Sequence, residues 1–179
     1  MRKLAELNKP KLIDLLGERL AFEHASVELY DALIGKLETS NDDRALILLD
    51  ELRVQRDEER EHEDWLADQM QLLGADPRVP TELAELARRE TRGIEEVILE
   101  DDHELSHLLH ALLAAELSDN AGWDLLVALA EEAHDRDAKR QLKQRLREEQ
   151  AHLAFVHIAL RRLAFYNVLG EDVWMPTAP

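Results

Sequence analysis

The chain has 179 residues, of which 45% are hydrophobic and 34% charged, a balance that suits one domain with a sizeable core. Its formal net charge of −17 repels phosphate backbones and attracts cations, so we expect no nucleic-acid partner. Cysteine is absent, which excludes disulfides, thiolate zinc sites and cysteine-ligated iron–sulfur clusters.

Four long helices are predicted, because Leu and Ala dominate the apolar residues and only six glycines and five prolines are present. In chain order, the helical patterns cover residues 11–37, the stretch from the turn at 38–43 to residue 73, and residues 103–132 and 139–167. The segment 74–80 ends the second helix, and the connection 81–102 that follows is itself a candidate short helix.

The connection lengths predict the topology. Short turns make the first and second helices antiparallel neighbours, and likewise the third and fourth. The connection 81–102 is near the length of a bundle and suits a crossover. We therefore expect an all-α four-helix bundle of two αα-hairpins joined by a long crossover. It forms one domain over residues 1–168, followed by a tail at 169–179.

Neither a membrane span nor a secretory signal is recognised. No apolar run approaches the roughly 18 residues of a span, and the first residues lack a long uncharged core. We therefore expect a cytoplasmic protein without a membrane partner.

Each of the four apolar stripes contains a carboxylate where an apolar residue is expected. The second and fourth stripes also place a histidine three residues after the glutamate, on the same helix face. These interrupting residues are, in chain order, Glu23, Glu59, His62, Glu116, Glu149 and His152. Unpaired buried charge is costly, so we expect cations among them. Oxygen and imidazole donors suit iron or manganese.

The Glu-x-x-His spacing alone is weak evidence, since the chain contains five such pairs. Only the pairs at 59/62 and 149/152 interrupt an apolar stripe in mid-helix. A stripe of Glu and His over residues 100–110 lies away from Glu116 on the third helix, and we interpret it as a surface face rather than a second metal site. It comprises Glu100, His103, Glu104, His107 and His110. His24 and His157 receive no role.

The two halves of the chain repeat the same order. Glu23 precedes Glu59 by 36 residues, and Glu116 precedes Glu149 by 33. Antiparallel hairpins with similar turns then place all six groups at one level. An aromatic residue follows seven positions after each lone glutamate, Tyr30 in the first half and Trp123 in the second.

This ligand order resembles that of the ferritin-like di-iron carboxylate proteins, including bacterioferritins and rubrerythrins, over about residues 11–167. The resemblance implies two iron ions, with manganese as the alternative metal. Glu59 and Glu149 would bridge the ions, Glu23 and Glu116 would be terminal ligands, and each histidine would hold one ion. Tyr30 would supply an extra electron.

Glu58 and Glu148 occupy positions where bacterioferritins have acids bonded to the ligating histidines. Solvation is the alternative for these two acids, as core packing is for Tyr30 and Trp123.

Some positions depart from these relatives. Arg60 stands where bacterioferritins carry a haem-ligating Met, so we expect no haem. A rubredoxin-like cysteine domain is absent, and Leu113 or Asp119 replaces a further rubrerythrin glutamate. The Pro-containing tail makes a poor fifth helix, so we expect a homo-oligomer smaller than a ferritin cage, a dimer.

The expected function is a di-iron oxidoreductase that couples Fe(II) oxidation to reduction of O2 or peroxide. Two alternatives remain open at this point. One is an oxidase or hydroxylase of a small organic substrate with the same centre. The other is a metal-free helical interaction module, in which the buried groups form a polar network.

Overall fold

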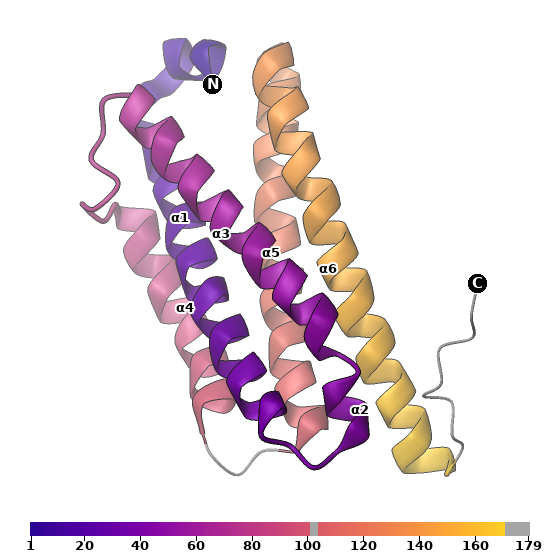
Figure 1. The fold of residues 1–179 in the computed structure, drawn as a ribbon. Helices are drawn as coiled ribbons and strands as arrows, with labels where there is room; N and C mark the ends of the chain where they lie inside the picture. Colours follow the sequence, from indigo (N-terminus) through magenta and orange to yellow (C-terminus); the bar gives the residue numbers. More distant parts are fainter. Residues whose placement is uncertain (101–103, 171–179) are drawn as a thin grey trace.

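The computed structural model describes residues 1–100 and 104–170 of the chain. It is all-helical in that part of the chain (Figure 1). The helices are α1 Arg2–Glu38, α2 Asp43–Leu46, α3 Leu49–Leu72, α4 Glu82–Leu99, α5 Leu105–Glu132 and α6 Arg136–Leu169. Both His103 and almost all of the expected tail lie outside the described residues, so the division at residue 168 stays a prediction.

Two helical hairpins make the bundle, as the connection lengths predict. The helix α1 packs along α3, and α5 packs along α6 (Figure 1). The long connection between the hairpins is α4, which packs mainly on α1 and also contacts α5. Thr81 caps it by accepting a hydrogen bond from Ala84 N at 3.2 Å. The crossover is therefore an 18-residue helix that covers the outer side of α1.

Two predicted helix boundaries differ from the structure. Residues before the expected start at 11 are also helical, but Asn8 breaks the helix with φ −157° and ψ 81°. Its side chain accepts a hydrogen bond from Lys11 N at 3.3 Å, and Pro10 fits the first turn that follows. The second predicted helix is divided into α2 and α3 by a turn at residues 47–48.

The apolar core consists of two clusters, one toward each end of the bundle. On α1, for example, Leu16 belongs to one cluster and Leu29 to the other; on α3 the corresponding residues are Leu66 and Leu52. The same change of cluster occurs near the middle of α5 and α6. A polar layer therefore interrupts the core at one level in all four long helices.

No helix within residues 1–100 and 104–170 has the length and hydropathy that crossing a membrane requires.

Asp135 fastens the turn between α5 and α6. Its carboxylate caps α6 by accepting from Ala138 N at 3.2 Å, and it also accepts from Lys3 N at 2.9 Å. The N-terminal ammonium lies 3.6 Å away. Burial by itself raises the pKa of Asp135, but these backbone donors and the N-terminus outweigh it and lower the pKa below 3.8.

We expect Asp135→Ala to lower the free energy of unfolding at pH 7 by about 1–2 kcal/mol, the usual effect of losing such a cap. Because the pKa is lowered in the folded state, the charged group stabilises the fold above pH 3.8. That contribution is lost as the pH falls through the lowered pKa. Urea unfolding at pH 7 and pH 3 measures both effects. Asp137→Ala, at an exposed position in the same turn, is the control, and an equal loss in both variants would contradict the prediction.

Candidate metal centre

The polar layer of the core contains all six interrupting residues. Each is almost fully buried, with side-chain exposures between 0% and 2%. Glu23 comes from α1, Glu59 and His62 from α3, Glu116 from α5, and Glu149 and His152 from α6. The structure therefore brings together every residue that the sequence pattern singled out.

The six side chains form two overlapping groups of four. In each group, one oxygen or nitrogen from every residue lies within 4.8 Å of the others. The first group is Glu23, Glu59, His62 and Glu149; the second is Glu59, Glu116, Glu149 and His152. Glu59 and Glu149 belong to both. Two cations bound in these groups would therefore share two carboxylates.

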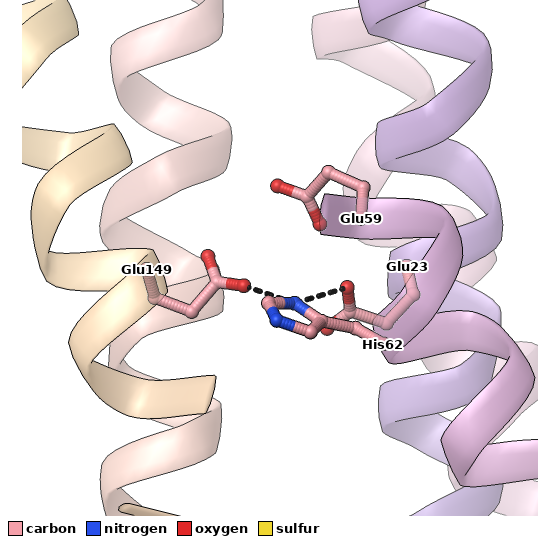
Figure 2. A group of neighbouring side chains, drawn as sticks. All are labelled: Glu23, Glu59, His62 and Glu149. Atoms are coloured by element: carbon pink, nitrogen blue, oxygen red, sulfur yellow. Dashed lines mark ion pairs between the residues drawn. The ribbon is translucent and has the colours of Figure 1, made fainter. Parts of the chain in front are cut away.

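Figure 2 shows the first group, with Glu149 on one hairpin facing the other three residues across the core. The Nδ1 atom of His62 lies 2.7 Å from Glu149 Oε1 and 3.6 Å from Glu23 Oε2. In the second group, His152 Nδ1 lies 3.1 Å from Glu59 Oε1 and 4.0 Å from Glu116 Oε2. Each histidine thus presents Nδ1 to the carboxylates.

The other nitrogen of each imidazole points to a partly exposed acid of the opposite hairpin. His62 Nε2 donates to Glu148 Oε2 at 2.9 Å, and His152 Nε2 donates to Glu58 Oε2 at 2.7 Å. Because a carboxylate is acceptor-only, these bonds place a proton on Nε2 and orient Nδ1 inward. The hydrogen bond to His62 also lowers the pKa of Glu148.

Two buried aromatic residues orient the lone glutamates, again across the hairpins. The Tyr30 hydroxyl donates to Glu116 at 2.7 Å, and Trp123 Nε1 donates to Glu23 at 2.7 Å. Gln55 Oε1 lies 3.1 Å from the same hydroxyl. Burial and the charge of Glu116 raise the pKa of Tyr30 well above 10.0, so the phenol holds its proton.

Burial and mutual repulsion govern the electrostatics of the layer. Both raise the pKa of Glu59 well above 4.5, and they raise that of Glu116 to about 8. Burial also raises the pKa of Glu23, but hydrogen bonds with His62 and Glu59 outweigh it and lower that pKa to about 2. Burial likewise opposes charge on the histidines, yet their acidic partners raise the pKa of His62 to about 12 and of His152 to about 9.

Hydrogen bonding satisfies these groups only in part. Within the six residues, the buried side-chain atoms without a hydrogen-bond partner are Glu23 Oε2, Glu59 Oε2, Glu116 Oε2, Glu149 Oε1, Glu149 Oε2 and His62 Nδ1. Native cores leave few such atoms unpaired, because each costs free energy. All of them are electron-pair donors suited to a hard or borderline cation. The residues therefore fit a pair of metal ions.

A buried ion pair beside the layer escaped the sequence analysis. Arg19 Nη1 donates to Asp119 Oδ1 at 2.5 Å, and both side chains are almost fully buried. Gly122 makes room for it, since a Cβ there would overlap the guanidinium. Burial and the charge of Glu149 raise the pKa of Asp119, whereas Arg19 opposes that shift. Asp119 follows Glu116 by about one helical turn, and this spacing was the feature of the sequence that could have indicated that Asp119 is buried beside the layer.

The Glu and His stripe at 100–110 lies outside both groups of four. Glu100, Glu104, His107 and His110 are exposed, and His103 lies outside the described residues. His24 is exposed and pairs with Glu63 at 2.9 Å. His157 is exposed on α6.

No family model and no curated protein sequence matches the chain. Among solved structures, the fold is similar to a crystal structure described as ferritin-like, diiron-carboxylate proteins from Bacillus anthracis strain Ames. The TM-score is 0.64 at 17% sequence identity, covering 89% of this chain and 99% of the other. The chain therefore has a ferritin-like all-α fold, and the predicted fold class is confirmed.

We expect Arg19→Met to lower the free energy of unfolding by about 3–5 kcal/mol, because it leaves Asp119 buried without its counter-charge. Chemical denaturation measures the loss. The double variant Arg19→Met/Asp119→Leu restores much of it, since only the partly exposed Glu18 carboxylate then lacks its Arg19 partner. If the double variant is less stable than the single one, the pair does not stabilise the fold through charge compensation.

We expect Glu149→Gln to lower the free energy of unfolding of the metal-free protein by about 3–5 kcal/mol, because it removes the buried carboxylate that lies 2.7 Å from His62, whose raised pKa of about 12 keeps the imidazole charged. Thermal unfolding in the presence of a chelator measures this. The Arg145→Gln variant controls for general effects of substitution on α6. A metal-free Glu149→Gln protein that melts above the wild type would show that repulsion among the carboxylates outweighs the ion pair of Glu149 with His62.

Proposed function

We propose that the six buried residues bind two metal ions, which we expect to be iron, with manganese as the alternative. The observation that carries this proposal is the pair of four-residue groups with Glu59 and Glu149 in common. The shared glutamates would bridge the ions. Each remaining pair of one Glu and one His would complete the ligand set of one ion, with the histidine binding through Nδ1.

Charge balance supports two divalent ions. The four glutamates carry four negative charges, and two divalent ions carry four positive ones. Next to the site, Arg19 pairs with Asp119 and with the partly exposed Glu18, and this sum counts the four glutamates of the layer alone. Neutral imidazole is the form that binds metal, so metal binding would displace the Nδ1 protons. The donor set lacks thiolates and consists of oxygen and imidazole, which suits iron or manganese.

We propose that the protein couples Fe(II) oxidation to the reduction of O2 or peroxide. Two Fe(II) ions supply the two electrons that, with two protons, convert O2 to H2O2 or H2O2 to two waters. The chain's own groups would hold the ions and exclude bulk water. Glu58 and Glu148 would orient the histidines, while Trp123 and Tyr30 orient the two terminal carboxylates.

A cavity of about 340 Å³ between α3 and α6 supports a small polar reactant. Buried His152 forms part of its wall. The remaining lining is mostly polar or charged: Glu51, Val54, Glu58, Gln144, Arg147, Glu148 and Ala151. A mostly polar cavity of this kind beside His152 suits a metal ion, O2 or peroxide better than an apolar organic substrate. It therefore favours this function over a hydroxylase.

The metal-free interaction module is the weaker alternative. It would leave the unpartnered carboxylate oxygens of the layer without compensation. The diiron-carboxylate description of the Bacillus anthracis structure agrees with the proposed metal site. The absence of haem, the cytoplasmic location, the homodimer and the redox role of Tyr30 stay predictions.

The test is metal binding followed by oxygen uptake. We expect anaerobic titration of metal-free protein with Fe(II) to reach two ions per chain. His152→Ala reduces that stoichiometry and abolishes Fe(II)-dependent O2 or peroxide consumption, because one ion loses its nitrogen ligand. Matched controls are His157→Ala, an exposed position on the same helix, and His107→Ala in the 100–110 stripe.

Binding of well under one Fe(II) per chain by the wild type would overturn the metal proposal. Equal losses in all three histidine variants would place the site elsewhere. Two bound irons without reaction toward either oxidant would reject the redox function while keeping the metal centre.

A further inference from the structure

A chain of aromatic rings leads from one side of the polar layer to the protein surface. Trp123 is fully buried, and its ring centroid lies 5.4 Å from that of His62. The ring of Trp65 follows at 6.0 Å. Trp65 is partly exposed, and its Nε1 donates to Gln141 Oε1 at 3.3 Å. The rings thus connect a candidate ligand with solvent.

This arrangement uses scarce residues. The chain has three Trp, two Tyr and three Phe, and two of the three tryptophans lie in this path. At His152 only the inner contact has an equivalent, because the ring centroid of buried Tyr30 lies 6.4 Å away, and within the described residues no further ring continues from Tyr30 to the surface. Phe155 stands three residues after His152, as Trp65 stands after His62, and in the described part of the chain no ring contact joins Phe155 to the centre. Core packing alone would not require an outer ring in contact with the inner one in the first half and none in the second.

The surroundings of the two indoles differ in a way that suits electron transfer. Trp123 Nε1 donates to the Glu23 carboxylate, whose negative charge stabilises the positive charge that develops on the ring when it loses an electron. The Arg145 guanidinium lies 3.9 Å from the Trp65 ring centroid, and its positive charge disfavours a lasting cation on that ring. An oxidised state therefore settles on Trp123, and Trp65 passes electrons inward to it.

We propose that Trp123 is a one-electron donor to the metal centre and that Trp65 links it to a one-electron reductant at the surface, such as a thiol or ascorbate. Electron donation from Trp123 would matter when peroxide reaches a centre that holds one Fe(II) instead of two. This part of the proposal rests on the proposed function. One Fe(II), one indole N–H, one H2O2 and one proton give one Fe(III), one neutral indolyl radical and two waters. The indole proton and the added proton both enter the waters, and an electron and a proton from the reductant later restore Trp123.

The path itself is tested in metal-free protein, where no iron chemistry is involved. Because the chain has no cysteine, Asp68→Cys provides a unique attachment point for a ruthenium polypyridyl photosensitiser, three residues after Trp65 and exposed. Trp174, outside the described residues, is replaced by Phe. Laser excitation with an external electron acceptor oxidises the label, and transient absorption then follows the tryptophan radical.

We expect a tryptophan radical from the label at position 68, and its yield falls by about an order of magnitude in Trp123→Phe, where the long-lived site is lost. Trp65→Leu slows radical formation on Trp123 by a similar factor. The matched control carries the label at Ile158→Cys, three residues after Phe155, and forms no tryptophan radical. A radical of equal rate and yield in all these proteins would overturn the path.

A second measurement addresses the role in peroxide chemistry. Protein loaded with one Fe(II) per chain is mixed with H2O2, frozen rapidly and examined by electron paramagnetic resonance. We expect a tryptophan radical in the wild type and none in Trp123→Phe, with the two proteins compared at the same measured amount of bound Fe(II). A working path in the metal-free protein but no radical here would overturn Trp123 as the donor. Failure to bind Fe(II) would reject the proposed function. The laser experiment on the metal-free protein would then be the remaining test of the electron-transfer path.

Discussion

The burial of four glutamates at one level of the bundle is the constraint on which the rest of the structure depends. Each is at most 2% exposed, and several of their oxygens have no hydrogen-bond partner. An uncompensated carboxylate in such surroundings is costly, so the fold must oppose that cost nearby. It does so with two imidazoles and the Arg19 guanidinium in the protein itself, and the unpartnered oxygens leave room for cations to supply the rest.

The compensating contacts also hold the two hairpins together. Both histidine–acid bonds and both aromatic–glutamate bonds run from one hairpin to the other. These contacts matter because α3 and α6 otherwise meet at few points, and the cavity of about 340 Å³ opens between them. The polar layer therefore supplies most of the hydrogen bonds between the hairpins, while the apolar clusters at either end pack residues of all four long helices together.

Much of this arrangement was predictable because it has helical periodicity. Glu59 and His62 interrupt an apolar stripe at a spacing that shares one helix face, and the second hairpin repeats the pattern. The resemblance led to the expectation that Glu58 and Glu148 bond to the two histidines, but which acid meets which histidine depends on how the two hairpins approach each other. Arg19 resembled a solvated surface residue until its partner Asp119 and the space left by Gly122 were known. The helix α4 was foreseen as a candidate, but its place on α1 depends on tertiary packing.

The internal repeat ends where the two halves acquire different neighbours, and this difference gives the two candidate metal positions different characters. The position of Glu23 and His62 lies beside Arg19, Arg145 and the two indoles. The position of Glu116 and His152 lies beside neutral Tyr30 and Gln55, and His152 borders the cavity. Nearby positive charge weakens cation binding, whereas an open approach speeds exchange. Reactants would therefore arrive at the His152 side and electrons at the His62 side, so that a symmetric ligand set serves an asymmetric reaction.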